Sequence, residues 1–253
     1  MMGLLAKIFD ILYPETNICL NCGRKYLFSE LRSICDYCLG YVEFLEFYCI
    51  HCGRAMDEVE ELCSFCHEHV SAFDLARSVG VYDGLLKNLI LKFKYEGCQE
   101  LSRPLVELLA IAFEEHYFHA KVDRIVSVPI HATRLQERGF NQAELLAGGL
   151  ALKTGIPLST AVKRIKEQAP LYNYAYQERK ELLKNSFSVE DGIFAGENIL
   201  LVDDIFTTGA TTSEISRLLK DKAGAKEVRV LTVATVAAPE RTMKLGMVIN
   251  KKI

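Results

Sequence analysis

The chain has 253 residues, of which 50% are hydrophobic and 25% are charged, and its formal net charge at pH 7 is -3. This is ordinary usage for a soluble globular protein, long enough for one medium domain with an appendage or for two domains. The nearly balanced charge excludes a general electrostatic attraction to nucleic acid or to an anionic membrane. Any binding of a polyanion must therefore depend on local clusters of charge.

The first fifteen residues predict a short amphipathic helix. Apolar side chains recur there every three or four positions, and Pro14 ends the pattern. The segment has neither the basic leader nor the small-residue cleavage site of a secretory signal peptide. No other stretch reaches the apolar length of a membrane-spanning helix. We therefore expect a cytoplasmic protein without membrane insertion.

The next segment, residues 16–70, contains an internal repeat built on cysteines. The sequence CLNCGRKYLFSELRSICDYC is followed by CIHCGRAMDEVEELCSFC, so that each copy opens with CxxCGR and closes with a second CxxC pair. The repeat groups the first pair with the second and the third pair with the fourth. These cysteines are Cys19, Cys22, Cys35, Cys38, Cys49, Cys52, Cys63 and Cys66, whereas Cys98 stands alone and is expected to be a small, partly buried side chain.

Two facing CxxC turns supply four thiolates, which is the tetrahedral ligand set that zinc prefers. Glycine suits the tight turn after each opening pair, and the arginines that follow, Arg24 and Arg54, can offset part of the negative charge of the thiolates. Disulfides belong to oxidising compartments, and the first fifteen residues carry no export signal. The sequence therefore predicts two structural zinc sites in a double zinc-ribbon module.

Two other interpretations of the cysteines remain open. The spacing alone does not distinguish zinc from an iron–sulfur centre. His51, His67 and His69 also lie close enough in sequence to replace a cysteine in one site, although eight cysteines already complete both sets. In each case most of the folding energy of such a small module would come from its metal.

From about residue 72 the pattern changes to alternating strands and helices. Strands are predicted at 78–82, 124–130, 161–165, 199–202 and 228–236, and helices at 85–93, 101–117, 135–152 and 212–222. Strands separated by helices of this length are typical of a mostly parallel α/β sheet flanked by helices. We expect this domain to cover residues 72–240, followed by a C-terminal tail at 241–253.

The most informative motif follows the apolar run ILLV. Asp203 and Asp204 come next, and the loop at residues 207–211 is TTGAT. Ligands of parallel sheets collect where strands end and helices begin. Two carboxylates in a turn there can hold vicinal ribose hydroxyls beside Mg²⁺, while hydroxyls and backbone N–H groups of the loop wrap a phosphate. The motif therefore predicts a site for a sugar phosphate, and neither GxxxxGK[ST] nor GxGxxG is present.

Residues 199–211, ILLVDDIFTTGAT, resemble the phosphoribosyl pyrophosphate (PRPP) motif of type I phosphoribosyltransferases. The resemblance extends to the ComF/GntX family, which is linked to DNA uptake in naturally competent bacteria and joins a cysteine zinc module to such a domain. It covers the CxxC repeats, residues 86–97, 128–147 and 168–179, and RGFNQ at 138–142 is the most family-specific piece. It implies a type I phosphoribosyltransferase fold with an N-terminal zinc-ribbon module.

The resemblance also implies roles for individual residues. The two acids, Asp203 and Asp204, are expected to hold the ribose hydroxyls and Mg²⁺ at the catalytic centre. The expected 5′-phosphate ligands are Thr207, Thr208, Gly209, Ala210 and Thr211. The candidates on the pyrophosphate side are His131, Arg134, Arg138 and Asn141. Residues 166–179 occupy the position of the flexible hood loop, with Gln168 and Arg179 as candidates.

Three functions are compatible with these features. As a phosphoribosyltransferase acting in DNA uptake or utilisation, the protein would displace pyrophosphate from Mg-PRPP with a nucleophile that the sequence does not identify. As a non-catalytic, PRPP-responsive protein, it would bind single-stranded DNA through basic residues such as Lys92 and Lys94, which are interleaved with aromatic side chains. As an adaptor, it would dock proteins of a DNA-import machinery on the zinc module. The oligomeric state stays open, and related folds are commonly dimeric.

Overall fold

The structure is a computed structural model that describes residues 17–27, 29, 31, 33–58, 61–167, 174, 176–239 and 241. The predicted N-terminal helix at residues 1–15 and nearly all of the predicted tail at 241–253 lie outside these ranges. Within them, no helix is both long and apolar enough to cross a membrane.

A five-stranded sheet forms the centre of the molecule, and all of its strand pairs are parallel. This confirms the predicted α/β class. Because the strands are parallel, their carboxyl ends meet at one edge of the sheet. In their order across the sheet the strands are β3 (Leu75–Val81), β9 (Glu227–Thr235), β8 (Asn198–Phe206), β4 (Arg124–Ser127) and β5 (Leu158–Ser159).

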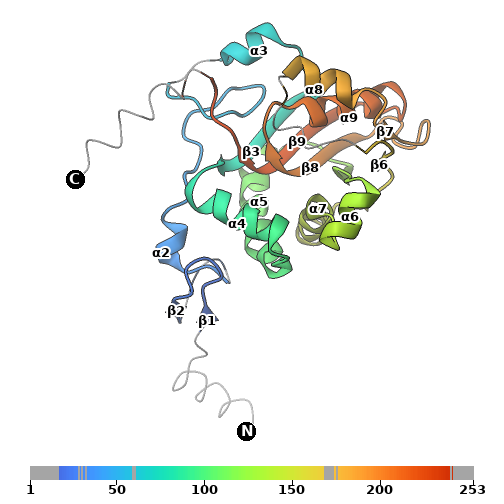
Figure 1. Ribbon diagram of the computed structural model, residues 1–253. Helices are drawn as coiled ribbons and strands as arrows, with labels where there is room; N and C mark the ends of the chain where they lie inside the picture. The colour runs from blue at the N-terminus through green and yellow to red at the C-terminus, as the bar shows by residue number, and fades with distance from the viewer. Residues whose placement is uncertain are drawn as a thin grey trace.

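Helices cover both faces of this sheet, as a buried parallel sheet requires (Figure 1). One face carries α4 (Gly84–Tyr95), α5 (Ser102–Tyr117) and α7 (Gln142–Thr154), with a 3₁₀ turn, η1 (Gln99–Leu101), leading into α5. The other face carries α9 (Ala210–Asp221), with α8 (Tyr176–Leu183) beside it. Apolar side chains alternate between the two faces along β8, where Leu200 belongs to the first core and Leu201 to the second.

The two cysteine repeats lie against opposite faces of this domain. The first repeat contains β1 (Asn17–Ile18), β2 (Lys25–Tyr26) and α2 (Asp36–Leu39), and it shares a hydrophobic core with α4. The second contains α3 (Ser64–Glu68) and shares its core with α9. Figure 1 shows the first repeat projecting beyond α4, and α3 at the opposite end near α8. The chain crosses from one face of the sheet to the other between the two repeats.

The predicted helix at 135–152 is wrong in its continuity, because two helices occupy this region. The first is α6 (Ala132–Arg138), which ends at Gly139 with a left-handed φ of 77°. The second, α7, begins after Asn141, whose side chain accepts a hydrogen bond from the Ala143 N–H. Glycine tolerates positive φ and asparagine is a good N-cap, so the RGFN sequence both stops one helix and starts the next.

The predicted end of the strand at 199–202 is also wrong, because β8 continues through both acids to Phe206. Its ladder with β9 persists, so that Asp203 lies opposite Thr232 and Phe206 opposite Thr235. The two carboxylates therefore do not share a turn. As consecutive strand residues they project toward opposite faces of the sheet.

Smaller differences affect two other predicted strands. The strand at 161–165 is reduced to β6 (Lys163–Arg164), which pairs with β7 (Phe187–Ser188) outside the main sheet. The strand at 124–130 ends as β4 at Ser127, although Val128 still donates to the Val202 carbonyl. The following Pro129 has no N–H to extend the ladder.

Candidate functional site

The acidic pair, Asp203 and Asp204, lies near the carboxyl end of β8. The buried Asp204 side chain faces α4, and its Oδ2 atom is 2.8 Å from the Lys94 Nζ atom. Asp203 is only partly buried, and its Oδ1 atom accepts a hydrogen bond of 2.8 Å from the Asp204 N–H. One acid is thus neutralised by an internal cation, while the other faces away from that cation's helix.

The environment of the acidic pair raises the pKa of Asp203 and that of Lys94. Desolvation by the surrounding protein and the charge of Asp204 together raise the pKa of Asp203 to about 8, although Lys94 and the hydrogen bond from the Asp204 N–H partly oppose them. Burial disfavours the charged form of Lys94, but the Asp204 carboxylate outweighs it, so that the pKa of Lys94 is raised. Asp203 is therefore mostly protonated at neutral pH, and a cation arriving beside it would promote its ionisation.

The threonine loop, residues 207–211, connects β8 to α9. Gly209 has a φ of 77°, and a Cβ atom there would lie 2.7 Å from the Cζ atom of Phe206. Thr208 Oγ1 accepts from the Ala210 N–H at 3.4 Å, which orders the first turn of the helix. The loop thereby presents the exposed Thr207 and the half-buried Thr208 and Thr211 at the positive end of a 12-residue helix, an arrangement that suits an anion.

Two arginines contact this loop. Arg179, the hood candidate on α8, places its Nη1 atom 3.3 Å from Thr207 Oγ1 and 3.5 Å from Thr208 Oγ1. Arg54 donates to the Thr207 carbonyl from Nη2 at 2.8 Å and from Nε at 3.3 Å. Arg54 was not among the predicted site residues. The CxxCGR repeat marks this arginine, but no sequence pattern indicates a partner 153 residues away.

Two of the pyrophosphate-side candidates cap helices. His131 is the N-cap of α6 and accepts from the Thr133 N–H, and the Thr133 hydroxyl donates to Glu167 Oε1 at 2.9 Å. Asn141 caps α7, and its Nδ2 atom donates to the Val128 carbonyl at 3.1 Å. These contacts fix the loop after β4 beside the acidic pair's edge of the sheet.

Arg134 and an arginine that the sequence analysis missed, Arg164, place positive charge on this side. Burial lowers the pKa of Arg164, the nearby charge of Arg134 lowers it further, and Asp203 acts in the opposite direction. The guanidinium of Arg164 is therefore within electrostatic range of both the acidic pair and the loop after β4. Arg164 lies in a two-residue strand without a motif of its own, so the sequence offered no signal for it.

The fourth candidate on this side, Arg138, lies over the ring of Tyr95 on α4, with its Cζ atom 5.1 Å from the ring centroid. Its Nη1 atom donates to Gln142 Oε1 at 3.1 Å. Tyr95 is 67% exposed and directly follows Lys94, so the RGFNQ segment meets α4 next to the cation that pairs with Asp204. This brings residues 138–142 to the same edge as the acidic pair.

The remaining candidates are placed as follows. Lys92 donates to the carbonyls of Leu20 and Asn21 at 3.0 and 3.1 Å, and Lys94 pairs with Asp204, so both lysines make intramolecular contacts. Their nucleic-acid role stays a prediction. Gln168 lies outside the described residues.

Each cysteine quartet brings four Sγ atoms within 4.8 Å of one another, with the grouping that the repeat predicts. The Sγ atoms are 3.8 Å apart for Cys19 and Cys38 and also for Cys22 and Cys35, and they are 3.6 Å apart for Cys52 and Cys63. A tetrahedral zinc site with Zn–S bonds of about 2.3 Å requires Sγ separations of about 3.8 Å, so both quartets fit this ion. All nine cysteines lie in the described ranges and none forms a disulfide.

His51 lies next to the second quartet rather than within it. Its Nδ1 atom is 3.6 Å from Cys66 Sγ, and its ring stacks on Phe73 with centroids 5.0 Å apart. A histidine placed in this way orients a ligand and supports its charge. The eight cysteines are therefore the ligand set that supports two structural zinc sites.

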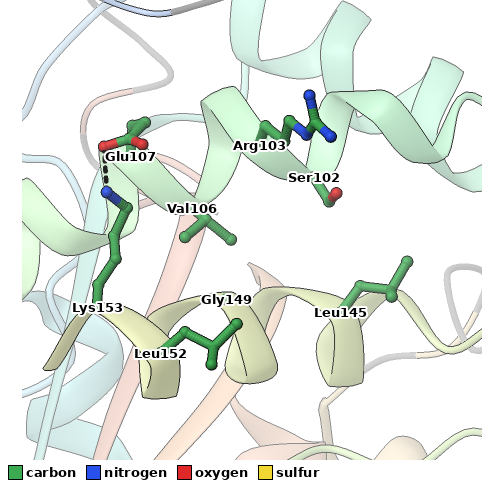
Figure 2. Close-up of a pocket in the computed structure, with 8 residues that line it drawn as sticks. All are labelled: Ser102, Arg103, Val106, Glu107, Leu145, Gly149, Leu152 and Lys153. Carbon is green, nitrogen blue, oxygen red and sulfur yellow. Dashed lines mark ion pairs between the residues drawn. The ribbon is translucent and has the colours of Figure 1, made fainter. Parts of the chain in front are cut away.

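Of the cavities formed by the described residues, two differ in their position relative to the candidate site. A groove of about 710 Å³ runs between α5 and α7, where the Glu107–Lys153 ion pair of 2.7 Å bridges the helices (Figure 2). A smaller cavity of about 230 Å³ lies at the end of β4, lined in part by Ser127, Asn141 and Arg164. The smaller cavity adjoins the loop after β4 and is thus the one next to the candidate site.

Comparison with known protein families finds two matches along the chain. Residues 8–70 match the double zinc ribbon domain, and residues 141–248 match the phosphoribosyl transferase domain. Competence protein F of Haemophilus influenzae is 32% identical over 223 residues, which are 85% of this chain and 96% of that protein. The chain belongs to the ComF family.

Other ComF relatives agree with this assignment. DNA utilization protein YhgH of Salmonella typhi is 31% identical over 84% of this chain and 94% of its own length, and competence protein ComFC of Bacillus subtilis is 28% identical over 88% and 86%. Among solved structures, adenine phosphoribosyltransferase of Saccharomyces cerevisiae is 18% identical over 55% of this chain and 79% of that chain, with a TM-score of 0.35. The family assignment rests on the sequence relatives.

Proposed function

We propose that this ComF-family protein binds PRPP with Mg²⁺ at the carboxyl end of β8 and acts as a phosphoribosyltransferase in DNA uptake or utilisation. The main support for the proposal is that the acidic pair and the threonine loop lie together where β8 ends and α9 begins. The names of the relatives, competence protein and DNA utilization protein, supply the cellular context. The predicted cytoplasmic location belongs to the same proposal.

In this proposal the acidic pair binds the ribose hydroxyls, and the threonine loop binds the 5′-phosphate at the start of α9. Mg²⁺ bound with PRPP would neutralise the pyrophosphate and stabilise the ionised form of Asp203. Arg134 and Arg164 add positive charge where the pyrophosphate leaves. A nucleophile forms a bond to C1 of the ribose while the bond from C1 to the pyrophosphate oxygen breaks, and the pyrophosphate keeps the electron pair. The protein contributes position and charge to this displacement.

Calorimetric titration with PRPP and Mg²⁺ tests the site. Wild-type protein should bind, whereas Asp203→Asn should lose at least tenfold in affinity, because an amide cannot supply the anionic ligand. Glu107→Gln, at the groove between α5 and α7, is the matched control and should bind as the wild type does. Equal affinities of the wild type and Asp203→Asn would refute the site.

Turnover requires a separate measurement because binding alone does not make the protein an enzyme. Release of pyrophosphate should be followed with candidate acceptors that include nucleobases, amines and single-stranded DNA. Release that depends on one acceptor and is lost in Asp203→Asn would support transfer. Tight binding without release from any acceptor would instead favour a non-catalytic, PRPP-responsive protein.

A second function, binding of single-stranded DNA, is favoured by one specific observation. Tyr95 is exposed and Arg138 is stacked on it, next to the proposed site, which offers a base a ring to stack on and a cation for its phosphate. Tyr95→Ala should then weaken binding of a labelled oligonucleotide at low salt, measured by fluorescence anisotropy. Tyr41→Ala, on the first repeat, is an exposed aromatic control. Wild-type protein that binds no oligonucleotide at low salt would rule this function out.

A further inference from the structure

The second zinc ribbon, residues 49–66, contacts the threonine loop directly through Arg54. The side chain of Arg54 is only 3% exposed, and both of its contacting nitrogen atoms donate to the Thr207 carbonyl. Charged donors make stronger hydrogen bonds than neutral ones, and a paired donation also fixes direction. A cysteine-ribbon residue therefore determines where one peptide group of the threonine loop points.

Aromatic rings hold the Arg54 guanidinium in this position. Its Cζ atom is 4.1 Å from the centroid of Phe65, which belongs to the ribbon, and 5.9 Å from that of Phe206, which ends β8. The ring of Phe206 also lies under Gly209, where a Cβ atom would approach it to 2.7 Å. The same ring thus supports both the arginine and the loop that it contacts.

The position of Arg54 depends in turn on the cysteine turn that precedes it. The Cys49 N–H donates to the Arg54 carbonyl at 3.0 Å, and the Gly53 N–H donates to the Cys49 carbonyl at 2.9 Å. Cys49 and Cys52 both belong to the second quartet. Because small cysteine modules owe most of their folding energy to metal, removal of this zinc would release the turn and with it Arg54.

We propose that the second zinc ribbon is part of the PRPP site, with Arg54 as a positioning residue through which occupancy of the second zinc site controls affinity for the 5′-phosphate. This inference rests on the proposed function. In a planar trans peptide the N–H of Thr208 points opposite to the carbonyl of Thr207. Arg54 therefore turns this N–H away from the ribbon, where a phosphate can reach it, and adds a positive charge behind the loop.

The first repeat supplies a matched control within the same chain. Arg24 occupies the position equivalent to Arg54 in the repeat, but its guanidinium lies over Tyr37 of its own ribbon, 4.1 Å from the ring centroid. The first ribbon packs against α4, on the opposite face of the sheet from α9. The same substitution at the two arginines therefore separates the specific contact from the general effect of changing a zinc ribbon.

The first experiment measures PRPP affinity in the presence of Mg²⁺ by calorimetry for the wild type, Arg54→Lys and Arg24→Lys. Lysine keeps the charge but cannot form the two-nitrogen contact. We expect Arg54→Lys to bind about tenfold more weakly with two zinc ions retained, and Arg24→Lys to bind as the wild type does. Equal affinities for all three proteins would overturn the inference alone. Absence of binding by the wild type would overturn the proposed function and this inference with it.

The second experiment needs no change in the wild-type fold. Coupling between two binding equilibria is reciprocal, so PRPP must raise the affinity for the second zinc by the factor by which that zinc raises the affinity for PRPP. Competition with a fluorescent zinc chelator should show one of the two zinc ions bound about tenfold more tightly in saturating PRPP. Cys19→Ser/Cys22→Ser, which retains the second site, should keep the effect, and Arg54→Lys should lose it. Zinc affinities that PRPP leaves unchanged would contradict the proposal.

Discussion

The two zinc ribbons are near-copies in sequence and differ in what they contact. The first holds an exposed Cys22 and packs on α4, partly through Lys92, which donates to two of the ribbon's carbonyls. The second shares a core with β8 and α9, and its fourth cysteine, Cys66, is half-buried where Cys22 is exposed, although each ribbon buries its other three cysteines. The comparison teaches that a repeated metal module is not one functional unit, because what each copy packs against decides its role.

Backbone contacts show the same difference. Around the second ribbon, the Ala76 N–H donates to the His51 carbonyl and the Ala238 N–H donates to the Ala55 carbonyl, so this ribbon is hydrogen-bonded to β3 of the central sheet and to the segment after β9. Around the first, the described backbone–backbone hydrogen bond to the domain comes from Glu43, in the segment that follows the ribbon, whose carbonyl accepts from the Val81 N–H. We therefore expect damage to the second ribbon to spread into the domain, and damage to the first to stay local.

The largest effect should come from removing one zinc ligand in each copy. Cys52→Ser should abolish the second zinc site and unfold the part of the domain core around α9, because Cys52 is 2% exposed within that core. Cys22→Ser should leave the domain's main thermal transition near its wild-type temperature. Zinc content and thermal unfolding measure both outcomes. Equal losses of stability in the two variants would break the comparison.

The equivalent glycines in the two CxxCG turns offer a finer test. Gly23 and Gly53 have φ values of 71° and 68°, so alanine costs about 1–2 kcal/mol at either position for its left-handed conformation alone. A Cβ atom at residue 53 would also lie 2.5 Å from the Ala76 carbonyl oxygen, whereas nothing lies within 4 Å at residue 23.

We therefore expect Gly53→Ala to lower the free energy of unfolding by about 3 kcal/mol or more, and Gly23→Ala by about 1 kcal/mol. Urea denaturation of the two single variants measures this difference. If both variants lose the same amount, then the close backbone approach of the second ribbon to β3 contributes nothing to stability.

Two lysines on α4, Lys94 and Lys92, separate the site from the attachment of the first ribbon. Lys94→Met leaves the buried Asp204 without its cation and should cost about 2–3 kcal/mol of unfolding free energy. Lys92→Met removes the donor to Leu20 and Asn21 and should cost about 1 kcal/mol, through loosening of the first ribbon. Hydrogen exchange should show that Lys92→Met loses protection within residues 17–42. Wild-type protection of these residues in Lys92→Met would contradict the prediction.

The sequence was sufficient for the fold class and for the zinc ligands, because both leave regular signals. Strands and helices that bury one face show their period directly in the spacing of apolar residues. Each copy of the cysteine repeat likewise shows its four metal ligands as two CxxC pairs in the sequence. The acidic pair and the threonine loop could be named as a candidate site for a similar reason, since their residues are contiguous in the sequence. Even so, β8 continues through the two acids where a turn was expected, because ladder bonds to β9 and the ion pair with Lys94 stabilise that extension.

The contacts that join distant segments could not be predicted. Lys94 was assigned to nucleic acid from its basic and aromatic neighbours, and the structure places it on Asp204, 110 residues later in the sequence. Arg54 and Arg24 occupy equivalent positions in the two repeats. Arg54 donates to Thr207, whereas Arg24 contacts only its own ribbon among the described interactions. The same CxxCGR pattern thus led to different partners, and the packing of the two ribbons on opposite faces distinguishes them.

The last prediction concerns pH, and it tests whether Arg54 acts on the threonine loop rather than on the acidic pair. Burial and the Asp204 charge raise the pKa of Asp203 to about 8, so this carboxyl must lose a proton to bind a cation. Affinity for Mg-PRPP should therefore rise from pH 6 toward pH 8, by at most about tenfold per pH unit, and level off above. Stability behaves in the opposite way, because a raised carboxyl pKa stabilises the fold at low pH and this contribution is lost as the pH rises through about 8.

Asp203→Asn removes this titration and should flatten both profiles, apart from the ionisation of PRPP itself, which all variants share. Arg54→Lys should bind more weakly at every pH with the wild-type profile retained, because its contact is with the Thr207 carbonyl and not with either acid. Calorimetry at several pH values distinguishes these results. A profile that shifts along the pH axis in Arg54→Lys would mean that the second ribbon acts on the charge of the acidic pair. The acids and the threonine loop could then no longer be treated as separate binding sites for the ribose and the 5′-phosphate.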